Sequence, residues 1–480
     1  MPLSIPQIKQ ELEQLNMFML QVEQQHSALL EKVHPSQYNS AVNLLNYLAL
    51  RSTDIRNLQD ALHEQGLSSL SSSESHIRSQ VLAVLKHFEH ISQPTTVSYS
   101  NSKMILQRRI NVLFGVASFP SIMVTLKTSH AHDYLAVKKL LKAGMNIARV
   151  NCAHDNEDTW IEMIKNVQQA SKSTGIACKI YMDLAGPKIR TVIKGKKKRI
   201  FLEEEDKLYF TNNNKSDKDG LPIVRSNIPT IASQLKEGEK VLFDDGLIEA
   251  KVTDIKNDGA QLEVTRVSSK KPYLKNEKGI NFPDSQLSLS ALTEFDRKCL
   301  PFILKHADMI GYSFVHNTPD LTELQNEMKD KKLPIILKIE TPEAFKNLPG
   351  LLFKAMEEEC FGVMLARGDL AVEMGFERMS EVQEEICWIC EAAHAPLIWA
   401  TQVLENMNKQ GIATRSEVTD AAHSIVAECI LINKGPHTVK VIKTLKDILQ
   451  RSSGHHLKKR FLLRPLQIAK EFLLNNEQQQ

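Results

Sequence analysis

From about residue 120 onward, the chain alternates between short runs of apolar residues and longer stretches in which apolar residues recur at helical spacing. A continuous apolar run is typical of a strand buried on both faces, as in a parallel sheet. The spacing corresponds to a strand followed by a helix, roughly 25–35 residues per unit. Eight runs are present, at 121–126, 146–151, 178–184, 308–314, 333–340, 361–369, 396–402 and 428–433. Eight such units predict an α/β fold, a TIM (β/α)8 barrel.

The interval between the third and fourth runs departs from this rhythm. Residues 191–279 contain segments that alternate between polar and apolar residues, such as KLYFTN and AQLEVTRV, with Gly, Asn and Asp between them. This pattern is typical of short strands joined by turns, so it predicts a small all-β domain inserted into the barrel. The basic run GKKKR at 195–199 is interpreted as a solvated hairpin rather than a ligand site.

Residues 1–115 are rich in Leu, Gln, Glu and Ser, with apolar residues at helical spacing. Leu12, Leu15, Met19 and Val22 fit one face of a first helix. Further helices are predicted at 43–51, 54–66 and 77–91, the last after a capping box formed by Ser71 and Glu74. This segment has no catalytic motif, and we interpret it as a helical interaction or covering module.

These patterns divide the chain into four parts. We expect a helical N-terminal extension at 1–115, a barrel at 116–190 and 280–450, an inserted β domain at 191–279, and a C-terminal helix and tail at 451–480. A chain of 480 residues is long enough for two or three such domains.

Composition narrows the class of protein. Hydrophobic residues make up 42% of the chain and charged residues 24%, which allows a large core, while a net charge of +3 argues against nucleic acid or membrane surfaces as partners. No run reaches the roughly 18 apolar residues of a membrane span. The 7 scattered cysteines and the polar N-terminus favour a reducing compartment, so we expect a cytoplasmic protein. Cys387 and Cys390 form a C-x-x-C on a predicted helix, which we attribute to core packing.

Polar side chains collect where the predicted strands end. In a TIM barrel the C-terminal ends of the strands meet at one rim, which carries the active site. The residues at these ends are Arg149, Asn151, His154, Asp183, Lys188, Arg190, Ser313, Lys338, Glu340, Arg367, Asp369, Thr401 and Gln402. Any one of them could belong to a structural ion pair. A purely structural rim does not need so many, because buried pairs contribute little to stability.

The types of residue suggest phosphoryl or enolate chemistry. Glu340 and Asp369 come from neighbouring strands, and two carboxylates so placed can hold Mg²⁺, which prefers oxygen ligands. Arg149, Arg190 and Lys338 can neutralise a phosphate and an enolate oxygen. The chain has no P-loop and no kinase glycine-rich loop, so a nucleotide would be bound by rim and inserted-domain residues.

Several segments in order along the chain resemble the pyruvate kinase family. NIARVNCAHD (146–155) is similar to its A-R-x-N-F-S-H-G motif, and MDLAGPKIRT (182–191) to its L-D-x-x-G-P-[EK]-I-R-T motif. The segments FDDGLI, KGINFP, LKIET, MLARGDLAVE, WATQVLENM and TRSEVTDAA match further family motifs, so the resemblance covers roughly 120–440. It implies that the inserted domain is a small β-barrel that acts as a mobile lid. The extension and the segments NCAHD and NKGPH are also similar to a short bacterial subgroup.

The resemblance implies roles for individual residues. Glu340 and Asp369 would bind Mg²⁺ (or Mn²⁺), Lys338 would neutralise the transferring phosphoryl group and the enolate, and Thr401 would lie beside the carbon that gains a proton. The substrate phosphoenolpyruvate would be bound by Arg149, Ser313, Lys338, Ala366, Arg367, Gly368, Asp369 and Thr401. The nucleotide, ADP, would lie towards Asn151, His154, Arg190 and Lys278.

Family members that need K⁺ have Glu where this chain has Lys188, and members with Lys there generally do without K⁺. Ala153 replaces a family serine that is a K⁺ ligand, and alanine offers no oxygen. We therefore expect Lys188, grouped with Asp183 at one site, to supply the positive charge in place of a monovalent cation, so that the chain has no K⁺ requirement.

Other features depart from the family. The family's regulatory C-terminal domain has no counterpart, so no allosteric control by sugar phosphates is expected. NKGPH (433–437) replaces the strand-eight motif S-G-E-T, and Lys127 and Thr128 replace Gly-Pro near the nucleotide. Three hypotheses stay open: a K⁺-independent pyruvate kinase of glycolysis, a related enolate enzyme with another phosphate acceptor or 2-oxo acid, and a non-catalytic binding protein. A homo-oligomer, with a dimer as the simplest form, is expected.

Overall fold

The computed structural model describes residues 3–88, 96–115, 120–193, 199–213, 220–269, 271–285, 287, 289–329, 331–453, 456–457 and 460–461. Its central strands are β1 (Ser121–Thr125), β2 (Ile147–Asn151), β3 (Lys179–Asp183), β13 (Met309–Tyr312), β14 (Ile335–Ile339), β15 (Phe361–Ala366), β16 (Leu397–Ala400) and β17 (Cys429–Ile432). They close into a parallel barrel in the order β1-β17-β16-β15-β14-β13-β3-β2. Each strand lies inside one of the eight apolar runs, and the predicted TIM barrel is confirmed.

Helices surround the barrel. They are α7 (Tyr134–Ala143), α8 (Glu157–Thr174), α9 (Glu294–His306), α10 (Thr318–Met328), α11 (Pro342–Lys346), α12 (Leu348–Ala355), α13 (Arg367–Met374), α14 (Met379–Ala392), α15 (Glu405–Gln410), α16 (Arg415–His423) and α17 (Thr438–Ser452), with short 3₁₀ turns at Thr128–Ala131, Phe376–Arg378 and Ser424–Val426. Side-chain caps fix where several begin. Asn156 accepts the backbone N–H of Thr159, and Thr293 and Asp296 form a capping box at α9. Cys387 and Cys390 are both buried on α14, in agreement with the packing interpretation.

The inserted segment forms a seven-stranded sheet in the order β12-β8-β9-β10-β6-β7-β4 and a two-stranded sheet of β11 and β5. The strands are β4 (Thr191–Val192), β5 (Arg199–Phe201), β6 (Lys207–Thr211), β7 (Ile223–Ser226), β8 (Lys240–Phe243), β9 (Ile248–Lys256), β10 (Gly259–Val267), β11 (Tyr273–Lys275) and β12 (Ile280–Asn281). Backbone hydrogen bonds from Thr191 to Lys278 and from Ile280 to Ile189 join the two chain segments that connect it to the barrel. Of the basic run GKKKR, residues 195–198 lie outside the described residues.

The N-terminal segment is helical. It contains α1 (Ile5–Gln25), α2 (Ser27–Leu30), a 3₁₀ turn at Pro35–Gln37, α3 (Tyr38–Arg51), α4 (Arg56–Glu64), a 3₁₀ turn at Glu74–His76, α5 (Ile77–Leu85) and α6 (Tyr99–Phe114). Leu12, Leu15 and Met19 are buried on α1 as predicted. The predicted capping box is wrong: the 3₁₀ turn precedes α5, and the Ser71 hydroxyl contacts that of Ser69. The positive φ of Ser72 (60°) turns the chain away from a helical start there.

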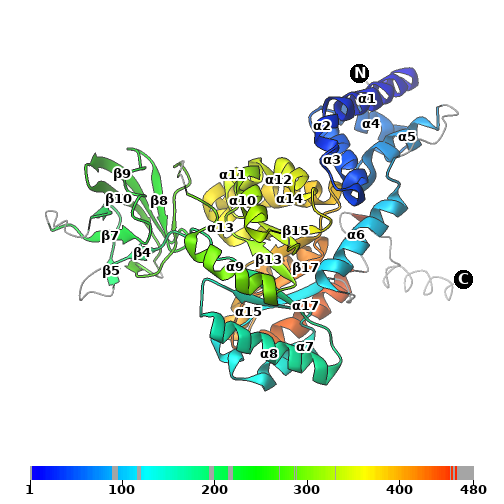
Figure 1. Cartoon of the computed structure of the whole chain (residues 1–480). Helices are drawn as coiled ribbons and strands as arrows, with labels where there is room; N and C mark the ends of the chain where they lie inside the picture. The colour runs from blue at the N-terminus through cyan, green and yellow to red at the C-terminus, as the bar shows by residue number, and fades with distance from the viewer. Residues whose placement is uncertain are drawn as a thin grey trace, which may run out of the picture.

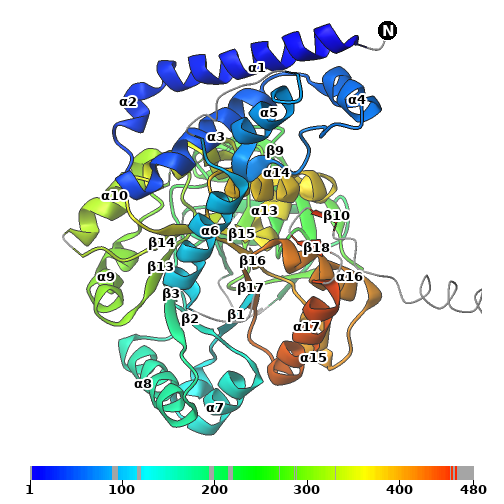
Figure 2. The same cartoon turned by 90° about the vertical axis from the view of Figure 1, so that its right-hand side faces the viewer.

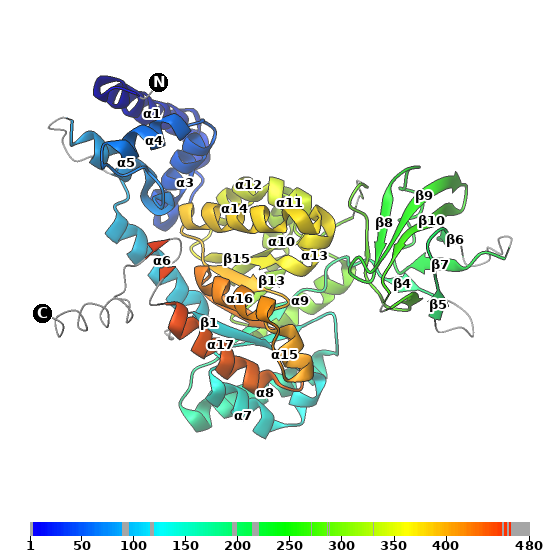
Figure 3. The same cartoon turned by 180° about the vertical axis from the view of Figure 1, so that it is seen from behind.

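The last helix of this segment, α6, closes the floor of the barrel. Its Ile110, Leu113 and Phe114 are buried in one cluster with the side chains that fill the barrel interior, among them Met123 and Met364. Figure 2 shows α6, in cyan, running across the end of the barrel. The other N-terminal helices and the inserted sheet lie on opposite sides of the barrel, as Figures 1 and 3 show. The extension therefore covers the end of the barrel opposite to the inserted sheet.

Arg109 on α6 ties the extension to the barrel. Its guanidinium is 5% exposed and donates to the backbone carbonyls of Ala393 (2.9 Å) and His394 (2.7 Å) and to the Ser40 hydroxyl (2.9 Å). Burial lowers the pKa of Arg109 to about 10. The two carbonyls lie just beyond α14, where the negative end of the helix dipole favours a cation. One side chain thus joins α6, α3 and the end of α14.

We predict that Arg109→Ala loosens the extension. Several buried hydrogen bonds to a charged donor are lost, and the carbonyls are left without a partner, at a cost of about 2–4 kcal/mol. Hydrogen exchange of α3 and α5, followed by mass spectrometry, should become faster. Arg108→Ala is the matched control, because its ion pair with Glu359 is exposed on both sides and contributes little. Equal exchange in the two variants contradicts this role for Arg109.

The C-terminal helix predicted for the end of the chain lies mostly outside the described residues. Near its start, β18 (His456–Leu457) and β19 (Arg460–Phe461) pair as two short antiparallel strands. Among the residues that the structure describes, no helix is both long enough and apolar enough to span a membrane.

Candidate active site

Five charged and polar side chains meet at the C-terminal ends of β2, β3 and β14 and just after β13. We call Arg149, Asp183, Ser313, Lys338 and Glu340 the rim cluster. The Lys338 ammonium lies 2.7 Å from the Ser313 hydroxyl, 3.3 Å from Asp183 Oδ2 and 3.1 Å from Glu340 Oε1. The Arg149 guanidinium donates to Asp183 through Nε (3.1 Å) and Nη2, and to Thr125 Oγ1 (2.9 Å). The sequence predicted these residues from their places at strand ends, and the structure brings them together.

The rim cluster is buried and balanced in charge. Asp183, Ser313, Lys338 and Glu340 are 1%, 1%, 7% and 3% exposed. Burial opposes the charged form of each ionisable group. Even so, Lys338 and Arg149 hold the pKa of Asp183 below its usual value, and Asp183 and Glu340 hold the pKa of Lys338 above its usual value. The ammonium of Lys338 is therefore retained in a site from which water is largely excluded.

Glu340 differs from Asp183. Burial raises its pKa, and the Asp369 carboxylate adds to this, although Lys338 and the backbone N–H of Phe314 (2.7 Å) favour the ionised form. A second positive charge beside Glu340 and Asp369 would relieve their repulsion. The two carboxylates are therefore close enough to repel each other, although each also contacts one ammonium group.

Glu340 and Asp369 suit a hard divalent cation. Both offer oxygen ligands, and Mg²⁺ is commonly bound by one or two carboxylates plus substrate oxygens and water. Among the described residues, no group of three or more His, Cys, Asp or Glu is placed to hold a metal. A site with two carboxylates fits an ion that shares its coordination with a substrate.

Lys188 contacts one member of this pair, Asp369. Its ammonium lies 2.7 Å from Asp369 Oδ1, whereas Asp183 is bound by Arg149, Lys338 and Tyr181. Lys188 thus brings a fixed positive charge to Asp369. From the sequence, Lys188 was grouped with Asp183 instead. Asp245 of the inserted domain lies close to both charges: burial raises its pKa, Lys188 opposes the shift and Asp369 adds to it. Sequence reasoning missed Asp245 as a site residue, although its D-D-G motif was the available signal.

The first turn of α13, which directly follows β15, and the loop after β16 are joined at the rim. Thr401 Oγ1 accepts the backbone N–H of Gly368 (2.7 Å), and both Thr401 and Gln402 have positive φ (68° and 59°). Because the Thr401 oxygen accepts here, its own O–H proton is left to donate elsewhere. These non-glycine residues in the left-handed region are held by their surroundings, which is common at functional sites.

Arg367 is held by residues of β16, α16 and the segment after β16. Its guanidinium donates to both carboxylate oxygens of Asp420 and to the carbonyls of Ala400 (3.2 Å) and Thr401 (2.7 Å). It also lies over the ring of Trp399, 4.5 Å from the centroid. In this geometry the Arg367 side chain supports the two rim loops, and any direct substrate contact from residues 366–369 would come from backbone groups or Asp369.

The residues expected on the nucleotide side lie near the inserted domain. Lys278 Nζ contacts Asp244 Oδ1 (2.8 Å), and Arg190 donates to the carbonyl of Glu277 (3.2 Å). Asn151 Oδ1 accepts the backbone N–H of Ala153 (3.0 Å). Burial lowers the pKa of His154, and the cations Lys434 and Arg190 add to this. His154 therefore sits in a cationic environment, which suits a nearby anion.

Asp296 supports the rim and was missed as a site residue. Besides capping α9, its Oδ1 accepts the N–H of Ala185 (2.8 Å) and its Oδ2 that of Gly186 (3.2 Å), which fixes the turn before Lys188. The capping box Thr293–Asp296 can be recognised in the sequence. The contact of Asp296 with Gly186, 110 positions earlier in the chain, cannot.

We predict a pH effect from Glu373 on α13. Burial raises its pKa to about 7, the Asn281 amide donates to it at 2.7 Å and opposes the shift, and Asp369 adds to it. The folded protein holds this proton more tightly than the unfolded chain, whose pKa is near 4.5. The stabilisation is therefore complete below about pH 4.5 and is lost as the pH rises through about 7.

The test is Glu373→Gln in metal-free buffer, followed by urea unfolding from pH 5 to 8. The amide still accepts from Asn281 but does not titrate, so the pH-dependent loss, on the order of 2 kcal/mol, should shrink. Glu377→Gln, at an exposed position in the following turn, should keep the wild-type profile. An unchanged profile in Glu373→Gln rejects the assignment.

Known proteins match most of this chain in sequence. The family model "Pyruvate kinase, barrel domain" matches residues 119–435. The pyruvate kinase of Geobacillus stearothermophilus is 31% identical over 325 residues, which cover 65% of this chain and 54% of the relative. That of Thermotoga maritima is 30% identical (67% and 68% covered), and that of Staphylococcus aureus is 30% identical (71% and 58%). The chain thus spans little more than half the length of two of these relatives.

Proposed function

Since this chain belongs to the pyruvate kinase family, we propose that it transfers the phosphoryl group of phosphoenolpyruvate to ADP, giving pyruvate and ATP. The observation that carries the proposal is the buried Lys338 ammonium, held by Ser313, Asp183 and Glu340 beside the carboxylate of Asp369. A buried cation next to a two-carboxylate site suits a reaction in which negative charge develops on an enolate and moves between phosphates.

The proposed roles follow from the contacts. The bond between phosphorus and the enol oxygen breaks, and a new bond forms to a β-phosphate oxygen of ADP. Lys338 neutralises the enolate oxygen and the transferring group, and Arg149, held by Asp183 and Thr125, contacts phosphate. When bound to Glu340 and Asp369, Mg²⁺ (or Mn²⁺) supplies further neutralisation of the phosphoryl oxygens.

A proton then joins the methylene carbon of the enolate. Thr401 is the candidate donor, directly or through water, because its oxygen already accepts from Gly368 and its hydroxyl proton is free to point at the substrate. The inserted domain contributes Asp245 and Lys278, and its closure would exclude water from the site. As a family member of this kind, the chain would act in the cytoplasm, as a homo-oligomer.

One observation favours a second candidate, a related enolate enzyme with a different phosphate acceptor. On the nucleotide side, Thr128 donates to Asp155 (2.8 Å), and Gly435 packs against Asn408, which donates to the carbonyl of Asn433 (2.6 Å). These are the positions at which the sequence departs from the family. These changes lie on the acceptor side and leave the residues of the rim cluster in place, so the rim cluster serves both candidates.

A coupled assay of pyruvate formation separates the candidates. Phosphoenolpyruvate, Mg²⁺ and each nucleoside diphosphate in turn are supplied, and turnover with ADP supports the proposal. Turnover with a different acceptor supports the second candidate, and no turnover with any of them supports a non-catalytic binding protein.

We predict that activity does not depend on K⁺. The Lys188 ammonium, 2.7 Å from Asp369, supplies a fixed positive charge at the site. In buffer free of Na⁺ and NH₄⁺, adding K⁺ should change kcat less than about twofold, while Lys188→Met should lower kcat by roughly tenfold or more. Lys142→Met, on the outer helix α7, is the control. A large activation of the wild type by K⁺ disproves the idea.

A further inference from the structure

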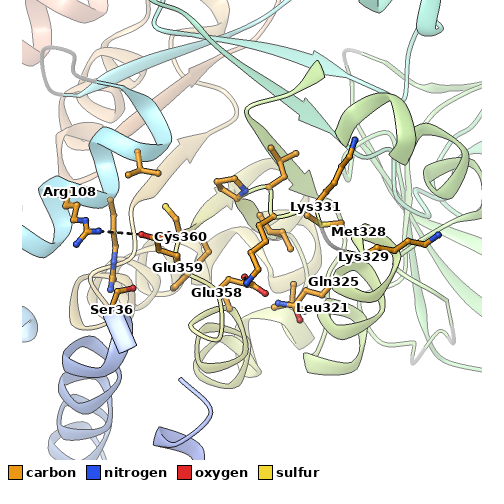
Figure 4. Close-up of a pocket in the computed structure, with 18 of the residues that line it drawn as sticks. Ser36, Arg108, Leu321, Gln325, Met328, Lys329, Lys331, Glu358, Glu359 and Cys360 are labelled. Carbon is orange, nitrogen blue, oxygen red and sulfur yellow. Dashed lines mark hydrogen bonds and ion pairs between the residues drawn. The ribbon is translucent and has the colours of Figure 1, made fainter. Parts of the chain in front are cut away.

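A cavity lies at the end of the barrel opposite to the rim cluster, between the N-terminal extension and the barrel. It has a volume of about 440 Å³ and is bounded by α6, the ends of α10 and α12, and the first residues of β14 and β15 (Figure 4). Ser36 of the extension also reaches it. Neither the rim cluster nor any residue proposed for catalysis lines this cavity.

The floor of the cavity is apolar and well packed. Leu321, Met328, Ile335 and Phe361 line it, and they are 0%, 5%, 6% and 1% exposed. The floor of the cavity offers ordered water few hydrogen-bonding partners, because these four side chains carry no hydrogen-bonding group. It suits an apolar group of a ligand instead.

The border of the cavity carries a surplus of positive charge. Figure 4 shows Arg108 beside Glu359 on one side, and Lys329 and Lys331 extending outward on the other. Five cations and two carboxylates line the cavity. The cations are Arg108, Arg109, Lys329, Lys331 and Lys332. Both carboxylates are already paired: Glu358 with Lys332 (3.1 Å) and Glu359 with Arg108 (3.5 Å). Among the described residues, Lys329 and Lys331 have no carboxylate within ion-pair distance.

A second, shallower hollow adjoins the cavity along α6. It is lined by Met104 and Val112, which are 63% and 50% exposed, together with the polar side chains of Gln107, Arg108 and Asn111. Val112 and Arg108 belong to both, so the two hollows adjoin. Exposed apolar side chains around a cavity are typical of a binding site rather than of a solvated helix face.

We propose that this cavity binds a small organic anion with an elongated apolar body. The apolar body would lie on the floor formed by Leu321, Ile335 and Phe361, and the anionic group would lie at the border. Lysine side chains are flexible, so the ammonium groups of Lys329 and Lys331 can fold back over a bound anion. The ligand would contact the extension and the first residues of β14 and β15 at once.

The charge of the border distinguishes this ligand from other occupants of an apolar cavity. A cation with the same apolar body would be repelled by Lys329 and Lys331, and a neutral molecule would gain nothing from their charge. A helix from another protein would cover the open hollow on α6 but would leave the enclosed floor unfilled. The anion is therefore the occupant that uses both features.

The test uses decanoate as the probe, below its micelle concentration, with decyltrimethylammonium as the probe of opposite charge. Isothermal titration calorimetry measures binding to the full chain. Cys360 gives a readout at the cavity itself, because its thiol lines the wall. Burial raises its pKa to about 11, so alkylation by iodoacetamide is slow and is followed by mass spectrometry. Cys178, which is also partly buried but lies elsewhere, is the internal control.

We expect saturable binding of decanoate and slower alkylation of Cys360 but not of Cys178. Val112→Trp should fill the mouth and weaken binding more than tenfold, and Lys331→Glu should weaken it roughly fivefold. The controls are Val418→Trp, at an exposed position on α16, and Lys443→Glu on α17; both should bind normally. Equal binding of the two probes, unprotected Cys360, or normal binding by Val112→Trp overturns the proposal, as does self-association of the chain through α6 without any binding of decanoate.

Discussion

Lys338→Met should abolish turnover, with kcat lower by about 10³-fold or more. The substitution removes the one ammonium that contacts Ser313, Asp183 and Glu340 together. It also leaves two carboxylates less compensated in a buried site, so the pKa values of Asp183 and Glu340 should rise and a proton should be taken up. Arg149 still pairs with Asp183, which keeps part of the rim cluster in place.

The measurement is the initial rate of pyruvate formation from phosphoenolpyruvate, alongside thermal unfolding of the same samples. Lys179→Met is the matched control: it lies at the start of β3, its ion pair with Asp308 is 38% exposed on both sides, and its loss should leave kcat unchanged. A Lys338→Met variant that folds and keeps more than a tenth of the activity would refute the assigned site.

Gly311→Ala should destabilise the protein by about 3 kcal/mol or more. A Cβ at this position of β13 would overlap the Tyr181 hydroxyl and Asp183 Oδ1, both of which lie inside the barrel. These two groups are hydrogen bonded to each other (2.9 Å), and both are almost fully buried. The added methyl group must therefore displace either the backbone or the Asp183 carboxylate, so activity should fall with stability.

The double variant Gly311→Ala/Tyr181→Phe tests the cause. Removing the hydroxyl relieves part of the overlap, so the double variant should be more stable than the sum of the two single changes predicts. Gly350→Ala on α12 is the control, since the nearest atom to its new Cβ would be Thr318 Cγ2 at 3.7 Å, an ordinary contact. Additive effects of the two changes, measured by urea unfolding, argue against the overlap.

The barrel could be predicted because its signal is local. Each of the eight strands is a run of apolar residues, and the barrel geometry alone then brings the ends of those runs to one rim. That step places Arg149, Asp183, Lys338 and Glu340 near one another without any knowledge of side-chain contacts. The same step cannot give the direction of a side chain, so it does not say which groups of Arg367 lie towards the rim.

The features that the sequence did not reveal depend on partners far along the chain. Arg367 turns towards Asp420 and Trp399, and a single arginine after a strand gives no sign of this. In the sequence, Arg109 is one of several charged residues on an amphipathic helix. In the fold it is buried, because two backbone carbonyls at the end of α14 accept its hydrogen bonds. Glu373 and Asp296 likewise act on residues from another part of the fold. Pairings of this kind follow from the assembled structure and not from periodicity.

The position of α6 affects how the barrel can be produced and studied. Its Leu113 and Phe114 are buried with the residues of the barrel interior, although they precede the first barrel strand in the sequence. During synthesis this helix leaves the ribosome before the eight barrel strands, so its apolar side can be buried only after they have followed. A fragment cut at residue 120 would leave the interior open at one end. For biochemistry and for crystallisation, the extension and the barrel should therefore be expressed as one unit.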